Sequence, residues 1–168
     1  MAKIRPEIVG RLFDEHAEAL VLFARQWLPN PEDVVQDAFV KLARLHNPPE
    51  SVVAWLYKVV RNGAVDAARR AYRRLKRERY ASNREAWFDS TDDSIDAQTA
   101  TKLLNELDPN LREIVVARIW GELTFDEIAR IAGVSLATAR RRYLEGLAVL
   151  QERIEPECSQ MNLIDKNK

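Results

Sequence analysis

The residues best suited to chemistry lie between Ser135 and Glu145, in the stretch SLATARRRYLE. Arginine can donate paired hydrogen bonds to guanine edges or bind phosphates, and a threonine hydroxyl can hydrogen-bond to either. If this stretch is helical, a rotation of about 100° per residue places small, hydroxyl and charged side chains on one face. That face holds Ala137, Thr138, Arg141, Leu144 and Glu145, flanked by Arg140 and Arg142. The pattern predicts a surface that enters the major groove of duplex DNA.

Two short helices joined by a tight turn would position this face. Thr124 can cap the first helix, and Glu127 follows three residues later, which is the spacing of a capping box. Gly133 suits the left-handed residue after a helix end, and Ser135 suits the N-cap of the second helix. An apolar stripe that we expect to be buried follows at intervals of three and four residues: Leu136, Ala139, Tyr143, Leu147 and Leu150. These signals predict a helix-turn-helix; the alternative is two surface helices with solvated charges.

A second basic region lies in the first half of the chain. Between positions 58 and 79 there are nine Lys or Arg residues against two acids, whereas positions 85 to 108 carry seven acids against one lysine. This asymmetry, in a chain of zero net charge, favours nucleic-acid binding. The basic end, RRAYRRLKRER, predicts phosphate contacts. Trp55 and Tyr57, near the start of the same segment, are either core and rim aromatics or stack on unpaired bases.

Helical patterns cover most of the chain, and we predict an all-α protein. Only 5 of the 168 residues are glycine, and 46% are hydrophobic, which suffices for real cores. The periodicity predicts helices from Pro6 to Leu28, from Pro31 to about Leu45, and from Ser51 to about Arg79. Further helices are expected after Thr101 and from Asp108, as N-cap, to Gly121.

The organisation that follows is two small helical domains, at residues 1–80 and 101–156, joined by a flexible acidic linker at 81–100. Because that linker offers little apolar surface, we expect the two halves to move relative to each other in the free chain. Pro156 is expected to end the last helix, and residues 157–168 are expected to form a disordered tail.

Several function classes are disfavoured. Cys158 is the only cysteine, and His16 and His46 are the only histidines, so a disulfide framework, a zinc site or a Ser-His catalytic pair is not expected. No apolar run reaches membrane-spanning length, and the first ten residues lack a signal-peptide core. We expect a non-enzymatic protein without metal or nucleotide cofactor, located in the cytoplasm and not inserted in a membrane.

Together these segments resemble the small sigma factors of bacterial RNA polymerase, of the extracytoplasmic-function type. PEDVVQDAFVKLARL resembles the acid-rich Asp-Leu-Val-Gln-Glu-x-Phe helix of the family, and WLYKVVRNGAVDAARRAYRR resembles its Trp-Leu…Arg-Asn…Asp…Arg helix. LNELDPNLREIVVARIWGELTFDEIARIAGVSLATARRR resembles the family's Leu-Pro…Arg…Glu-Ile-Ala…Gly-x-Ser-x-x-Thr-Val module. The resemblance extends over about residues 10 to 153, in the family's order.

The resemblance implies partners and sites. The helix at 31–45, whose polar face could otherwise be ordinary solvated surface, would dock on core RNA polymerase through Asp33, Gln36, Asp37, Phe39 and Lys41. The next helix would hold the minus-10 promoter element open, with Asn62 near an unstacked base. The residues assigned to that element are Trp55, Lys58, Arg61, Asn62, Arg69, Arg70, Arg73 and Arg74. The helix-turn-helix would bind the minus-35 element through Ser135, Thr138, Arg140, Arg141, Arg142 and Glu145.

The resemblance also leaves questions open. Glu145-Gly146 stand where the family usually has a basic residue before alanine, and Ala139 replaces the usual valine. Glu145 either accepts from a cytosine amino group or weakens backbone contact. The free protein is expected to be a monomer, and an anti-sigma factor is a further candidate partner. The alternative function is a helix-turn-helix regulator that binds duplex DNA without joining the polymerase.

Overall fold

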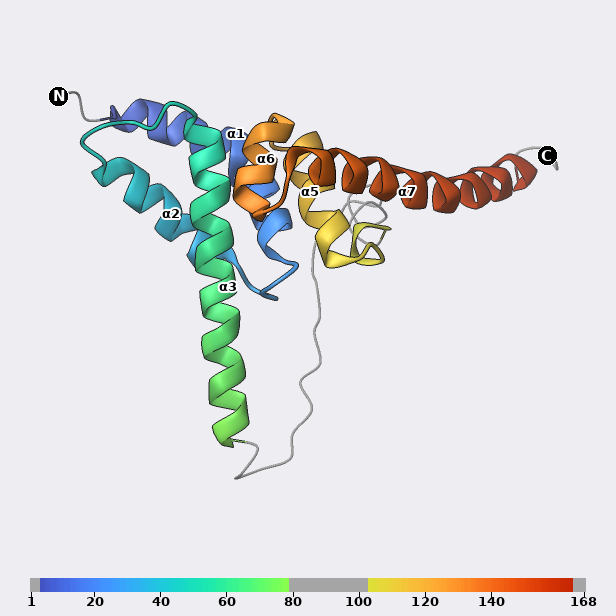
Figure 1. The fold of residues 1–168 in the computed structure, drawn as a ribbon, viewed down its shortest axis with the longest axis horizontal. Coiled ribbons are helices and arrows are strands. Elements are labelled where there is room, and N and C mark those ends of the chain that lie inside the picture. The colour runs from blue at the N-terminus through green and yellow to red at the C-terminus, as the bar shows by residue number, and fades with distance from the viewer. Residues whose placement is uncertain (1–3, 79–102, 165–168) are drawn as a thin grey trace.

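The computed structural model describes the backbone of residues 4–78 and 103–164, and throughout these ranges the regular secondary structure is helical, with no strand. Six helices of five or more residues make up this part of the chain (Figure 1). The predicted all-α class is therefore confirmed. The proposed linker at 81–100 lies outside the described residues.

The first half is built from α1 (Pro6–Ala24), α2 (Glu32–Arg44) and α3 (Val52–Glu78), which pack against one another pairwise. Apolar residues at helical spacing fill the space between them, with Leu20, Phe23, Leu42 and Leu56 fully buried. Ser51 starts α3, where its Oγ accepts from the Ala54 amide at 3.3 Å. The far end of α3 projects beyond the other helices (Figure 1).

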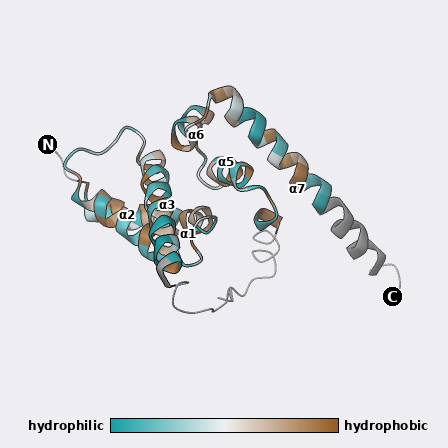
Figure 2. Cartoon of the chain, turned by 60° about the horizontal axis from the view of Figure 1, so that its bottom comes forward, coloured by the Kyte–Doolittle hydropathy of each residue, from teal (hydrophilic) through white to brown (hydrophobic). Residues whose placement is uncertain are grey.

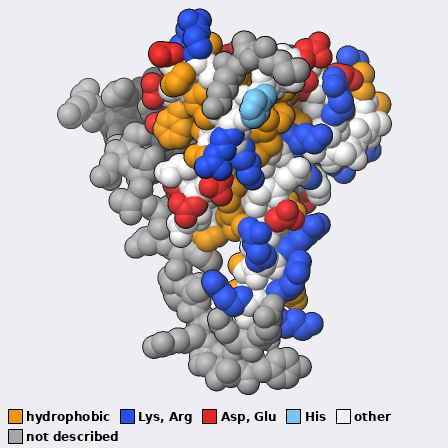
Figure 3. Space-filling view, turned by 90° about the vertical axis from the view of Figure 1, so that its left-hand side faces the viewer, with side chains coloured by type: hydrophobic (Ala, Val, Ile, Leu, Met, Phe, Trp, Pro, Cys, Tyr) orange, Lys and Arg blue, Asp and Glu red, His pale blue; other side chains and the backbone are white. Residues whose placement is uncertain are grey.

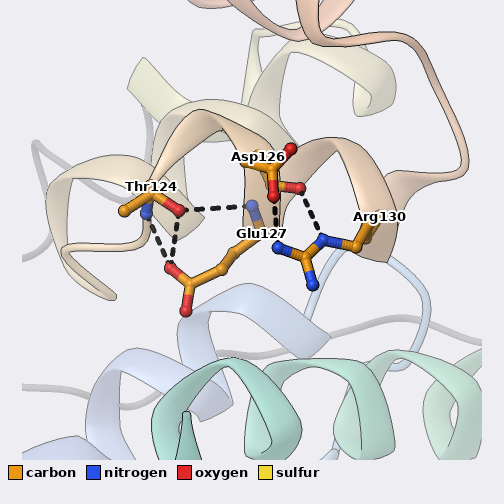
Figure 4. A network of polar contacts seen from close by, with 4 residues as sticks. All are labelled: Thr124, Asp126, Glu127 and Arg130. Carbon is orange, nitrogen blue, oxygen red and sulfur yellow. Dashed lines mark hydrogen bonds and ion pairs between the residues drawn. The ribbon is translucent and has the colours of Figure 1, made fainter. Parts of the chain in front are cut away.

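The second half consists of α5 (Pro109–Ile119), α6 (Phe125–Ala132) and α7 (Leu136–Ile164). Asp108 caps α5 by accepting from the Asn110 amide at 2.9 Å, as expected. The capping box of α6 is complete: Thr124 Oγ1 accepts from the Glu127 amide, and the Glu127 carboxylate accepts from the Thr124 amide at 2.9 Å (Figure 4). Gly133 ends α6 with φ of 69°, in the left-handed region predicted for it.

Some boundaries differ from the predictions. Helix α1 ends at Ala24, not Leu28, because the chain turns over residues 25–27, which places the Trp27 ring against Phe23 of α1 and the Arg61 guanidinium of α3. Pro31 serves as the N-cap of α2, one residue later than expected. The prediction that Pro156 ends the last helix is wrong, since α7 continues to Ile164. Proline removes one backbone hydrogen bond, while its fixed φ is compatible with the helix on either side.

The apolar stripe expected on α7 is buried only in part. Ala139 is fully buried, but Leu136 is 39% exposed because it lies in the first turn, at the edge of the helix-turn-helix. Ile119 and Trp120, assigned by periodicity to the apolar side of α5, are also exposed at the end of that helix.

Buried side chains of the two halves form one continuous core. Helix α1 packs against α5, and α3 packs against α6. In Figure 2, α5 lies between α1 on one side and α6 and α7 on the other. At the junction, Tyr57 of α3 is fully buried and its ring lies beneath Gly121, where a Cβ atom would come within 2.7 Å of it. No sequence pattern predicted this contact between the halves.

A second close approach sets the position of α7. A Cβ atom at Gly146 would lie 2.6 Å from Cγ2 of Val115, in the middle of α5. Atoms in folded proteins do not approach that closely without displacement, so the absence of a side chain at Gly146 lets α7 rest directly on α5. Glycine in place of the family's usual alanine therefore has a packing reason.

Candidate nucleic-acid and polymerase interfaces

The beginning of α7 presents its hydrogen-bonding face to solvent. Ser135 Oγ accepts from the Thr138 amide at 3.1 Å, which caps the helix, and donates to Thr138 Oγ1 at 2.8 Å. Arg140, Arg141 and Glu145 are exposed. The structure thus brings together the side chains that the sequence assigned to one face, and it leaves that face uncovered by other described elements.

Aromatic and cationic side chains behind this face fix the angle between α6 and α7. Phe125 packs edge-to-face on Tyr143, with ring centroids 5.4 Å apart. Arg118 lies over the Phe125 ring at 4.9 Å, with its Nη1 donating to the carbonyl of Leu123 at 2.6 Å. Arg140 approaches the same ring at 5.9 Å. Cation–π contacts of this kind hold the guanidinium of Arg140 near the recognition face.

Polar contacts on α6 extend toward the first half of the molecule. Arg130 forms an ion pair with Asp126 one turn earlier, while the Glu127 carboxylate points toward α3 (Figure 4). Burial raises the pKa of Glu127, but hydrogen bonds from Ser51 and Thr124, together with nearby Arg130, outweigh it and hold that pKa below its ordinary value. Ser51 belongs to the start of α3, so this carboxylate joins the two halves.

The projecting end of α3 is a basic surface. Arg69, Arg70, Arg73, Arg74 and Lys76 are exposed there, and Lys and Arg side chains gather along this lower part of the molecule in Figure 3. An open, mainly apolar groove runs beside them, lined by Trp27, Val65, Ala68, Arg69, Tyr72 and Arg73. Aromatic rings between cationic side chains are typical of surfaces that bind single-stranded nucleic acid.

Other residues assigned to the minus-10 element divide into two groups. Lys58 and Asn62 are exposed, whereas Trp55 is partly buried and packs against the core. Arg61 is different from all of these. Its guanidinium forms an ion pair with Glu113 of α5, with Nε donating to Oε1 and Nη2 lying 3.5 Å from Oε2. The sequence placed Arg61 on a DNA-binding surface and gave no indication of this partner.

The polar face of α2 is exposed as expected, with Asp33, Gln36, Asp37 and Lys41 open to solvent. Phe39 does not share that face. It is 5% exposed and packs edge-to-face on Phe13, with ring centroids 5.0 Å apart. Its assignment as a direct polymerase contact is corrected to a supporting position beneath the face, because its turn of the helix points into the core.

Comparisons with known proteins match both halves to one family. The family model of Sigma-70 region 2 matches residues 12–74, and that of Sigma-70, region 4 matches residues 103–152. The chain belongs to the sigma-70 family. It is a sigma factor of the extracytoplasmic-function type, which binds core RNA polymerase and promoter DNA and directs transcription initiation. The interpretation as a regulator outside the polymerase is thereby set aside.

Relatives of this sigma factor cover most of its length. It is 30% identical over 152 residues to RNA polymerase sigma factor CarQ of Myxococcus xanthus, covering 84% of this chain and 86% of the relative. It is 27% identical over 145 residues to RNA polymerase sigma-E factor of Streptomyces avermitilis, covering 82% and 80%.

The fold of the sigma factor also has solved neighbours. One is the sigma factor RpoE in complex with the anti-sigma factor NepR from Bartonella quintana, with a TM-score of 0.65, 23% identity and coverage of 90% of this chain and 98% of that one. Another is CnrH in complex with the cytosolic domain of CnrY, with a TM-score of 0.59, 24% identity and 91% coverage of each chain.

Sequence reasoning missed the residues of the sigma factor that join its halves. Glu113, Tyr57, Gly121 and Trp27 all lie at or near this junction. One signal was available for Glu113: it stands directly before the apolar run Ile114–Ala117 in a short helix, where a charge needs a partner. The identity of that partner could not have been read from periodicity.

Proposed function

We propose that three separate surfaces of the sigma factor divide the work of initiation. The exposed polar face of α2 binds core polymerase. The region around Lys58 and Asn62 holds the minus-10 element open, and the basic end of α3 binds its backbone. The start of α7 reads the minus-35 duplex. No residue in this proposal performs catalysis, because the polymerase supplies the chemistry, and the site of action is the cytoplasm.

The observation that carries this proposal is the exposed face at the start of α7. Capping at Ser135 and the Phe125–Tyr143 contact hold it in a fixed orientation, with Arg141 and Thr138 available to base edges. A duplex-reading helix in the same chain as a basic, aromatic single-strand surface matches the needs of promoter opening. Among the described residues, no three His, Cys, Asp or Glu side chains are grouped to hold a metal ion.

The polymerase surface is tested by Asp37→Arg, with Asp14→Arg on exposed α1 as the matched control. Charge reversal at a contact should weaken core binding at least tenfold, because like-charge juxtaposition replaces attraction. Circular dichroism checks that both variants stay helical. Unchanged core affinity in folded Asp37→Arg would remove α2 from the interface.

The minus-10 surface is tested by Asn62→Ala, with exposed Asn30→Ala as control. The DNA is a promoter selected by the wild-type holoenzyme from genomic fragments. Promoter opening, followed by permanganate reactivity of unpaired thymines, should fall with Asn62→Ala, whereas binding of a minus-35 duplex should not. An equal loss of both activities would assign Asn62 a structural role.

We also propose an anti-sigma factor as a protein partner. The support is that one structural neighbour is a sigma factor in complex with an anti-sigma factor, and another, CnrH, is in complex with the cytosolic domain of CnrY. Gel filtration of the sigma factor from lysate of its own cells should then show a complex that excludes core polymerase, while the purified chain elutes as a monomer.

A further inference from the structure

The junction between the two halves contains a charged pair that packing alone does not require. Glu113 is the buried charged residue of the described core, with its side chain 8% exposed, and the Arg61 side chain is 27% exposed. Burying a carboxylate is costly unless a cation and hydrogen bonds compensate it. The buried Glu113 carboxylate therefore stabilises the arrangement of the two halves that keeps the Arg61 guanidinium beside it.

Three further contacts lie beside this pair or along the same stretch of α3. The Arg61 guanidinium lies 5.6 Å from the centre of the Trp27 ring. The Tyr57 ring fits beneath Gly121, one helical turn before Arg61 on α3. At the start of α3, Ser51 donates to the Glu127 carboxylate of α6. The contacts follow one side of α3 over about three turns, so the second half covers the same helix that carries the minus-10 residues.

We call this arrangement, with α6 packed on α3, the closed form. It brings the start of α7 close to α3, the helix that carries the minus-10 residues. Helix α6 packs on α3, and α7 begins three residues after α6 ends. With helix diameters of about 10–12 Å, the start of α7 lies within roughly 30 Å of α3. Elements named for positions 10 and 35 are about 25 base pairs apart, which is roughly 85 Å at about 3.4 Å per base pair. In this arrangement the start of α7 lies closer to the first turns of α3 than the two elements lie to each other along a straight duplex.

We propose that the Arg61–Glu113 pair is a latch that holds the free sigma factor closed, and that Arg61 transfers from Glu113 to promoter DNA when the halves separate. The second clause rests on the proposed minus-10 surface around Lys58 and Asn62, because Arg61 lies between these two residues on α3. A DNA phosphate offers the guanidinium the same paired acceptors as a carboxylate, so DNA and Glu113 compete for one side chain. A ligand that binds the form with separated halves more tightly than the closed form shifts the equilibrium toward separation, and so reduces the fraction of molecules that keep the Arg61–Glu113 pair.

Opening is measured by the distance between spin labels on the two halves. Cysteines introduced at exposed Glu18 of α1 and Ala148 of α7, in a Cys158→Ser background, carry the labels. Wild type should show one short distance. Glu113→Gln keeps the shape of the side chain and removes its charge, and should raise the ratio of open to closed molecules about 10- to 100-fold, as expected for the loss of a charged hydrogen bond. The control is Glu122→Gln, an exposed glutamate of the same half.

Arg61→Ala provides a second variant that opens the same junction, since it leaves Glu113 buried without its cation. The two variants should diverge on DNA. Glu113→Gln frees Arg61 and should bind the single-stranded minus-10 segment of a selected promoter more tightly than wild type. Arg61→Ala opens equally but lacks the contact, so its affinity should not exceed that of wild type.

The possible results distinguish failure of the latch proposal from failure of the proposed function. If neither variant lengthens the label distance, the latch is wrong, whatever happens on DNA. If both open but bind the DNA segment alike, Arg61 does not transfer to DNA and the second clause is overturned. Failure of the proposed function would instead appear as a wild-type protein that binds core polymerase but protects no minus-10 segment, with the label distances unaffected.

Discussion

Helices α3 and α7 are both long and both carry a basic surface, but they present it in opposite ways. Helix α7 has its reading residues in its first two turns, immediately after a capped turn, and this end is open to solvent. Helix α3 has its densest charge at its far end, while its first half packs on α6 and forms the Arg61–Glu113 ion pair with α5. Both basic surfaces are thus largely exposed, and the difference is that one residue assigned to the separated strands, Arg61, is held in an ion pair with Glu113.

The largest effect is expected from removing charge at the end of α3. The triple change of Arg69, Arg70 and Arg73 to alanine should lower affinity for single-stranded promoter DNA about 100-fold at 0.1 M salt and reduce the salt slope by about 2. Fluorescence anisotropy across a salt series measures both quantities. The same protein should bind the minus-35 duplex normally. Equal losses on both DNAs would show that the two surfaces do not act separately.

A smaller effect is expected from Arg141→Ala on the start of α7. Neither Arg141 nor Glu145 has an ion-pair partner within the described part of the chain, so Arg141 is available to DNA. The substitution should cost about 1–3 kcal/mol on the preferred minus-35 duplex. If Arg141 contacts a base, the loss of affinity should be smaller on scrambled DNA than on the preferred duplex. If it contacts a phosphate, both DNAs should lose affinity equally, and the salt dependence of binding should become shallower. Wild-type affinity of Arg141→Ala for both duplexes would mean that α7 does not present Arg141 to DNA.

The serine caps allow a matched comparison of the two helix starts. Ser135→Ala and Ser51→Ala each remove one hydroxyl acceptor and should lower the free energy of unfolding by about 0.5–2 kcal/mol in urea titrations. Only Ser135→Ala should also weaken minus-35 binding, because its helix end faces DNA. If Ser51→Ala weakens minus-35 binding as much, α6 depends on its Ser51–Glu127 contact more than on its own capping box.

The smallest effect concerns Glu145. Since it has no cationic partner among the described residues, Glu145→Ala should leave the unfolding free energy within about 0.5 kcal/mol of wild type. Removing its negative charge should leave duplex affinity unchanged or slightly tighter. A loss of discrimination at one cytosine position, measured by competition between substituted duplexes, would assign Glu145 to base reading.

Local signals made the helix-turn-helix predictable. The Thr124–Glu127 box, the left-handed Gly133 and the Ser135 cap each depend on residues within a few positions, and all three are present in the structure. The same holds for the Asp108 cap and for the exposed polar face of α2. Such features are encoded by short-range chemistry, which a single sequence displays directly.

Long-range contacts were not predictable in the same way. Arg61 and Glu113 are separated by 52 positions, and their residue types fit a solvated helix face as well as a buried pair. Periodicity reports which side of a helix is apolar, but it does not report which element covers that side. Leu136 illustrates this limit, because periodicity assigned it to the buried stripe and it is exposed. Phe39 illustrates a different one: periodicity favours the core side of its helix, where it is buried, and only the family resemblance made it a polymerase contact.

The contact of Gly146 with Val115 bears on how this sigma factor can change its promoters. The docking angle of α7 is set two turns or more beyond Thr138, and on the opposite side from Arg141. Residues assigned to base contacts can therefore be exchanged without changing this contact, whereas a side chain at Gly146 would force Val115 or α7 to shift. Promoter preference can thus change through substitutions on the exposed face of α7, while the packing of α7 on α5 is kept.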